Sequence, residues 1–331
     1  FSGGWGLKYE SRGCYEFVKK STHLWISHFH EDHLHRNTLL KILEVNPNLI
    51  IFANDSYNFQ MSKFFQKMGS KNLIILEERK EFQLTEDSSI KRYPATGIDN
   101  ALLIKHKGYS YLNLNDVVLS NIALKLLSAQ IGPIEIIMSN FNHAGKLMVN
   151  KFDNKNIRKS LIENYQKNIA PFDFQYNIPF ASYHYYRAPE SKEQNLAMIG
   201  MDELSSLSTS SIPLKLGESV FYNPEEKTFI KKNTLQIFQN NEEILVRSES
   251  IDLEELIYLS KIYLLKVNKR FLYLPSFFES LIIYIYDLGL NLKLSFKKNK
   301  ILVIKNQESH ISMHSSMLKK WFSSIYGTDQ L

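Results

Sequence analysis

The sequence predicts an α/β protein built as a four-layer αββα sandwich, followed by a smaller α+β appendage. Two observations predict this fold. Strand-like and helix-like segments alternate between residues 24 and 170, and the texture of the sequence changes after Pro189. The chain has 331 residues, of which 44% are hydrophobic, so it is long enough for one large or two ordinary domains.

The N-terminal region shows short apolar runs separated by amphipathic segments. Its Gly108 follows His106 and Lys107 at a turn between two alternating runs, which is typical of a β-hairpin. The segment 157–170 places its apolar residues on one helical face. We expect strands at 24–27, 49–53, 72–76, 90–93, 101–105, 109–114 and 135–139, and helices at 37–44, 55–68, 117–129 and 157–170.

The C-terminal region is rich in Lys, Asn and Ile. We expect helices at 191–201, 253–267 and 271–287, a serine-rich loop at 205–211, strand–turn–strand patterns at 212–223 and 292–306, and a strand followed by a helix at 310–331. This pattern predicts a larger domain at 1–225 and a small α+β domain at 233–331, and the motif and resemblance described below imply that the larger one is a metal-binding catalytic domain. The smaller domain is expected to cover the active site, bind substrate or mediate dimerisation.

The most informative motif is the bend His-Phe-His-Glu-Asp-His at 28–33, which directly follows a predicted strand. Imidazole nitrogen and carboxylate oxygen are ligands that suit zinc and iron. His28 and His30 are two residues apart, so in extended backbone their side chains point the same way and can bind one ion. Asp32 and His33 continue around the turn and can serve a second ion nearby.

Composition limits the other classes of function. The single cysteine, Cys14, excludes an internal disulfide and a cysteine-bound iron–sulfur cluster within this chain, and it favours a reducing, cytoplasmic location. The net charge of +6 is compatible with an anionic small-molecule substrate, but no basic arm or nucleic-acid motif is present. No apolar run reaches the ~18 residues of a membrane helix, so we expect no membrane span.

The motif resembles the H-x-H-x-D-H signature of the metallo-β-lactamase superfamily. Within it the chain is most similar to the branch that contains CMP-N-acetylneuraminate hydroxylase, and more distantly to N-acylphosphatidylethanolamine phospholipase D-like hydrolases. Supporting segments follow in order over about residues 1–225: FSGGWGL at 1–7, YSYLNLND at 109–116, IIMSNF at 136–141 and IPFASY at 178–183. The resemblance implies a metal-bridging or catalytic role for Asp116 and a water-orienting role for Asp32 or Asp116.

The chain departs from the superfamily pattern at two ligand positions. No histidine occurs in the segment 93–99 before the predicted hairpin, and none stands at the expected place directly after the strand end Ile178-Pro179, which continues as Phe180-Ala181. Asp99, His143 and His184 are the available substitutes. The alternative interpretations are a turn residue for Asp99 and a packed core residue for His184.

Three functions remain open. In the first, the site binds one or two iron ions, activates dioxygen and hydroxylates a substrate, as the hydroxylase resemblance implies. The Rieske cluster of that family cannot form within this chain, so the reaction would need an external electron donor, and a missing N-terminal segment is plausible. In the second, zinc activates water to hydrolyse a phosphodiester, ester or amide. In the third, a non-catalytic relative binds metal or a partner. The substrate and oligomeric state stay open.

Overall fold

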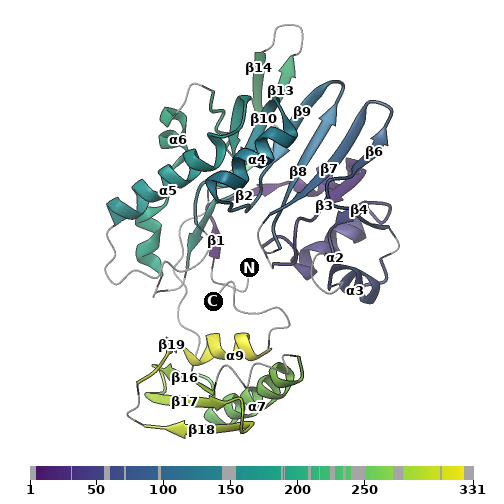
Figure 1. Ribbon diagram of the computed structural model, residues 1–331. Helices are drawn as coiled ribbons and strands as arrows, with labels where there is room; N and C mark the ends of the chain where they lie inside the picture. Colours follow the sequence, from purple (N-terminus) through teal and green to yellow (C-terminus); the bar gives the residue numbers. More distant parts are fainter. Residues whose placement is uncertain are drawn as a thin grey trace. The chain divides into compact units, whose positions relative to one another are not determined.

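The computed structural model divides the chain into two compact units, Gly3–Ile244 and Leu245–Leu331, which are described separately (Figure 1). The role of each unit stays a prediction. The structure describes residues 5–30, 32–55, 60–70, 72–95, 98–143, 154–187, 189, 191–207, 210–215, 217–223, 228–233, 236–239, 250–270, 279–305 and 308–323.

The larger sheet of the first unit has six strands in the order β11-β10-β9-β8-β7-β6. Its strands are β6 (Glu81–Thr85), β7 (Ser88–Pro94), β8 (Asn100–His106), β9 (Tyr109–Asn113), β10 (Ile134–Ser139) and β11 (Phe174–Pro179). Strands β6 to β9 are antiparallel neighbours, whereas β9, β10 and β11 run parallel. Lys107 and Gly108 both have positive φ, the backbone that a tight hairpin between β8 and β9 requires.

A second, three-stranded parallel sheet contains β3 (His23–Trp25), β4 (Ile50–Ala53) and β5 (Leu73–Ile75). Parallel neighbours need a crossover connection, and helices provide it in both sheets. These helices are α2 (Arg36–Val45) and α3 (Gln60–Lys67) in the smaller sheet, and α4 (Asn121–Ile131) and α5 (Asn154–Ile169) in the larger one.

The hydrophobic cores define four layers, α2/α3, small sheet, large sheet and α4/α5. Alternate residues of β4 face opposite sides, so Ile51 packs with the α2/α3 core while Phe52 packs against the large sheet. In β8, Leu102 joins the core between the sheets and Leu103 joins the core beneath α4 and α5. Figure 1 shows α4 and α5 together on one side of the large sheet, with α2 and α3 beside the small sheet. The protein is therefore a mixed α/β protein.

Short elements surround this sandwich. They are β1 (Trp5–Leu7) paired with β12 (His184–Tyr186), β2 (Tyr9–Arg12) paired with β15 (Gln236–Gln239), β13 (Glu218–Asn223) paired with β14 (Thr228–Asn233), and the helices α1 (Cys14–Lys20), η1 (Lys192–Ala197, a 3₁₀ helix) and α6 (Met201–Leu207). Because β15 pairs with β2, this strand belongs to the first unit although it lies beyond the expected start of the second domain at 233.

The second unit packs two helices against a four-stranded sheet in the order β18-β17-β16-β19. Its elements are α7 (Leu253–Arg270), β16 (Ser280–Ile285), β17 (Leu290–Ser295), β18 (Lys300–Ile304), β19 (Ile311–Met313) and α9 (Ser315–Ser323). The expected hairpin at 292–306 is present as β17 and β18. The expected helix at 271–287 is wrong for its second half, which forms β16, while 271–278 lie outside the described residues.

Candidate metal centre

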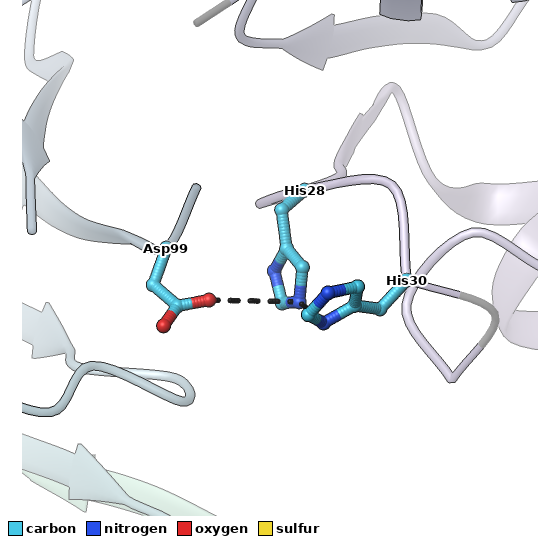
Figure 2. Close-up of side chains that lie close together, drawn as sticks. All are labelled: His28, His30 and Asp99. Atoms are coloured by element: carbon cyan, nitrogen blue, oxygen red, sulfur yellow. Dashed lines mark hydrogen bonds and ion pairs between the residues drawn. The ribbon is translucent and has the colours of Figure 1, made fainter. Parts of the chain in front are cut away.

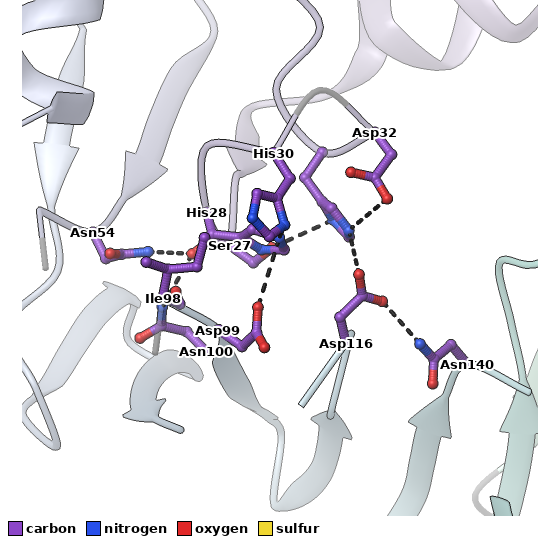
Figure 3. A network of polar contacts seen from close by, with 11 residues as sticks. Ser27, His28, His30, Asp32, Asn54, Ile98, Asp99, Asn100, Asp116 and Asn140 are labelled. Carbon is purple, nitrogen blue, oxygen red and sulfur yellow. Dashed lines mark hydrogen bonds and ion pairs between the residues drawn. The ribbon is translucent and has the colours of Figure 1, made fainter. Parts of the chain in front are cut away.

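The side chains of the predicted motif meet others at one edge of both sheets (Figure 3). The bend 28–33 follows the carboxyl end of β3, and Asn54 follows β4. Asp116 comes directly after β9, and Asn140 directly after the parallel strand β10. Asp99 immediately precedes β8, which runs antiparallel to β9 and so starts at the same edge. The fold thus brings together residues that are far apart in sequence.

The first group of candidate ligands is His28, His30 and Asp99 (Figure 2). Nε2 of His28 lies 2.8 Å from Nδ1 of His30 and 3.6 Å from Oδ1 of Asp99. One ligand atom from each residue lies within 4.8 Å of the other two. Three donor atoms therefore converge on one point.

The second group is His28, His33 and Asp116, whose ligand atoms satisfy the same limit of 4.8 Å. Nε2 of His33 lies 2.8 Å from Oδ2 of Asp116 and 3.6 Å from Oδ2 of Asp32. Asn115 helps to aim Asp116, because it adopts a left-handed backbone with φ of 54° that asparagine tolerates. Its N–H donates to Oδ1 of Asn113 at 2.8 Å, which fixes the turn after β9.

Ser27 contacts the Nδ1 atoms of His28 and His33 and so orients both rings. Its Oγ lies 2.9 Å from Nδ1 of His28 and 3.5 Å from Nδ1 of His33, so it can accept the Nδ1 proton of His28 and leave the Nε2 lone pair for an ion. Its carbonyl accepts from the side-chain amides of Asn54 and Asn100. Asn100 is in turn held by Nη1 of the buried Arg92, at 2.6 Å.

The carboxylate of Asp116 is also held from outside the bend. Nδ2 of Asn140 donates to its Oδ1 at 2.9 Å, while its Oδ2 faces His33. Metal ligands are commonly fixed by partners of this kind. Asn140 follows β10 as Asp116 follows β9, so position after neighbouring parallel strands is the signal by which the sequence could have revealed it.

Burial shifts the pKa of two donors of the first group in opposite directions, toward the neutral form of each. Burial, assisted by the nearby His33 and His30, lowers the pKa of His28 to about 3, and this residue is 1% exposed. His28 is therefore neutral at physiological pH. Burial and the nearby carboxylate of Asp116 raise the pKa of Asp99 to about 6. Such opposing shifts are typical of titratable groups gathered in a functional site.

His33 and Asp116 shift each other's pKa. Burial alone would lower the pKa of His33, but the hydrogen bond and charge of Asp116 outweigh it and raise that pKa. Burial alone would raise the pKa of Asp116, but the hydrogen bond and charge of His33 hold it below its usual range. Both shifts favour a positive charge between the two donors, which is the position that a bound cation would take, with release of any proton there.

These donors fit a metal ion. The lone pairs of two imidazole nitrogens 2.8 Å apart repel each other unless a proton or a cation lies between them, as for His28 and His30. All the donors are nitrogen or oxygen, the set that zinc, iron and manganese accept. The residues of the bend with Asp99 and Asp116 can therefore hold one or two ions.

The structure places the other two predicted ligands elsewhere. Nε2 of His143 lies 3.2 Å from Oε1 of Gln194, and its ring stacks on Tyr186. His184 is buried on β12, with its ring centroid 4.6 Å from that of Trp5. Burial lowers the pKa of both histidines, that of His184 to about 4. Among the described residues, neither belongs to the two groups that could hold a metal.

A cavity of ≈ 330 Å³ lies between β3 and α2 and reaches the second ligand group. Asp32 and His33 contribute polar atoms to its wall. Apolar side chains, among them Leu24, Ile26 and Ile42, line most of the remainder. The cavity is within the range of small-molecule sites.

Neither a protein-family model nor a curated protein sequence matches the chain. The solved structures similar to it include a candidate metal-dependent hydrolase from Parabacteroides distasonis, with 17% identity, a TM-score of 0.33, and coverage of 48% of this chain and 64% of that one. The metallo-β-lactamase fold protein YhfI from Bacillus subtilis shows 14% identity, a TM-score of 0.35, and coverage of 60% and 76%. Zinc-bound PqqB from Methylobacterium extorquens shows 12% identity, a TM-score of 0.32, and coverage of 47% and 57%.

The chain thus spans about three fifths of the length of the first and third of these proteins. The similarity to the hydroxylase branch stays a prediction. In the described parts of the chain, no helix combines the length and apolar character needed to cross a membrane.

Proposed function

We propose that the protein is a metal-dependent hydrolase of the metallo-β-lactamase superfamily. The convergence of the bend 28–33 with Asp116 carries this proposal. His33 and Asp116 are 83 residues apart, yet their side chains are 2.8 Å apart at the edge where β3 and β9 end. A strand-to-loop histidine cluster that merely faced solvent would not need a partly buried carboxylate partner from the other sheet.

The ligands would be His28 and His30 on one side and Asp32, His33 and Asp116 on the other. When bound, divalent ions supply Lewis acidity that lowers the pKa of water toward neutrality. Ser27 keeps the Nε2 lone pair of His28 directed into the site, and Asn140 fixes one oxygen of Asp116. Asp32 or Asp116 would orient the attacking water toward a phosphodiester, ester or amide.

The substrate would be a small molecule with an apolar part. The cavity between β3 and α2 supports this, because its lining residues include Asp32 and His33 beside several aliphatic residues. The net charge of +6 makes an anionic substrate compatible with the protein.

Purified protein loaded with zinc should hydrolyse at least one of three probes, bis(p-nitrophenyl) phosphate, p-nitrophenyl acetate and a chromogenic lactam. Asp116→Asn should lower kcat by at least about 100-fold, since it removes a ligand rather than a partner of one. The exposed Asp173→Asn is the matched control and should leave kcat unchanged. Equal turnover by wild type and Asp116→Asn would contradict the proposal.

A second candidate is an iron-dependent hydroxylase or oxidase. The first ligand group favours it, because two histidines and one carboxylate with open positions are typical of non-haem iron sites that activate dioxygen. Such a reaction would require an external electron donor. Oxygen uptake by iron(II)-loaded protein with a reductant, in the absence of probe hydrolysis, would favour this candidate. Protein without tightly bound metal would favour a non-catalytic relative.

A further inference from the structure

We infer that Asp99 is a metal ligand that joins His28 and His30 in a two-histidine, one-carboxylate set. The inference rests on the proposed metal centre and names the residue that takes the place of the missing histidine. The sequence left Asp99, His143 and His184 open for that place, and the geometry separates them.

Asp99 lies where a third ligand is needed. Its Oδ1 faces Nε2 of His28, the same nitrogen that faces His30 (Figure 2). By contrast, His143 contacts Gln194 and Tyr186, and His184 packs against Trp5.

The backbone around Asp99 is anchored from both sides. Its carbonyl accepts from N–H of Ala95 at 2.9 Å, which closes the turn between β7 and β8. Nδ2 of Asn100 donates to O of Ile98 at 2.6 Å and to O of Ser27 at 3.1 Å. The same side chain thus ties the Asp99 turn to the backbone beside His28, which fixes the distance between the two ligands.

The second group that satisfies the same limit is His28, His33 and Asp116, so His28 is common to both groups. Nε2 of His33 lies 2.8 Å from Oδ2 of Asp116 and 3.6 Å from Oδ2 of Asp32. The donors in all are three histidine nitrogens and three carboxylates. Three carboxylates offset most of the charge of two divalent ions, so the partly buried site can hold both.

The donor type supports this assignment. Two histidines and one carboxylate with open positions occur in catalytic zinc sites and in non-haem iron(II) sites, so Asp99 completes a set that either ion accepts. A histidine at position 99 offers a nitrogen donor in place of the carboxylate oxygen and should keep metal binding, whereas asparagine is a weaker ligand. Metal affinity therefore reports the role of Asp99 separately from any catalytic activity.

The test compares metal-free wild type with Asp99→Asn, Asp99→His and the control Asp173→Asn. Each protein is titrated anaerobically with iron(II) and zinc against a chelating dye, and circular dichroism checks the fold. We expect Asp99→Asn to weaken iron(II) binding by about 10- to 100-fold. Asp99→His should recover tight metal binding, while Asp173→Asn should match wild type.

The outcomes separate two kinds of failure. Wild type that binds metal, with unchanged iron(II) affinity in Asp99→Asn, would overturn the role of Asp99 and leave the proposed hydrolase standing. Wild type that binds neither ion would overturn the metal centre itself and the inference with it.

Discussion

At the scale of single residues, Asn100 links the fold to the candidate site. It is 1% exposed, and its side chain uses both its oxygen and its amide group. Oδ1 accepts from Arg92, while Nδ2 donates to the carbonyls of Ser27 and Ile98. One side chain thus satisfies a buried guanidinium and holds the backbone beside two ligands.

Replacing Asn100 with alanine should therefore destabilise the protein by about 2–3 kcal/mol, because it leaves Arg92 and two buried carbonyls short of partners. Chemical denaturation of Asn100→Ala against wild type measures this change. The control is Asn121→Ala at the exposed start of α4, which should stay within about 0.5 kcal/mol of wild type. A comparable stability for the two variants would show that the Asn100 network adds little.

The candidate metal ligands could be predicted from the sequence, but the residues that hydrogen-bond to these ligands and orient them could not. The motif at 28–33 and the strand end at Asp116 follow from residue type and spacing, and the structure brings these side chains together. Ser27 and Asn140 were missed as partners of the ligands, because their roles depend on which strands lie side by side. The choice among Asp99, His143 and His184 likewise needed three-dimensional distances.

At the scale of elements, Asp287 holds the start of α9 in the second unit. Its Oδ1 accepts from N–H of Ser315 at 2.8 Å, and its Oδ2 accepts from the hydroxyl of the same residue. Burial by itself would raise the pKa of Asp287, but the hydrogen bonds from Ser315 outweigh it and hold the pKa below its usual range. A carboxylate at a helix start also interacts favourably with the helix dipole.

Asp287→Asn should destabilise the second unit at pH 7 by about 1.5–3 kcal/mol, the contribution of hydrogen bonds to a charged group. Because the pKa is lower in the folded than in the unfolded protein, this stabilisation is present above the unfolded pKa and disappears as the pH falls through the folded one. The difference from wild type should therefore shrink in acid. Hydrogen exchange of the α9 amides at neutral and acid pH measures it, with the exposed Glu308→Gln as control. A difference independent of pH would contradict the role of the Asp287 charge.

Helices and hairpins with a clear hydrophobic period could be predicted from the sequence. For short apolar runs, the choice between helix and strand could not. The helix expected at 157–170 is α5, and the hairpin around Gly108 joins β8 and β9. For the apolar run in β16 the sequence predicts a helix, and the structure has a strand. A short apolar stretch has no hydrophobic period that distinguishes a buried strand from a helix. In the opposite sense, α6 extends through Leu207 into a serine-rich stretch expected to be a loop, since packing of Leu204 in the core overrides local propensity.

At the scale of the whole molecule, the four layers explain why the ligands meet. Strands β3 and β4 end at the edge where β9 and β10 also end, and the core between the sheets holds the two edges together. The alternation of strands and helices predicted such layers. The pairing of β15 with β2, which places residues beyond 233 in the first unit, could not be read from local sequence because it joins distant segments.

The central claim is that the bend 28–33 and its carboxylate partners bind metal ions. Elemental analysis of purified wild type, His30→Ala and the exposed control His106→Ala tests it directly. We predict about two ions per chain in wild type and in the control, as expected for a two-metal site. His30→Ala should lose most of its metal while keeping the circular dichroism spectrum of the wild type. Equal metal content in His30→Ala and wild type, or no bound metal in either, would contradict the account.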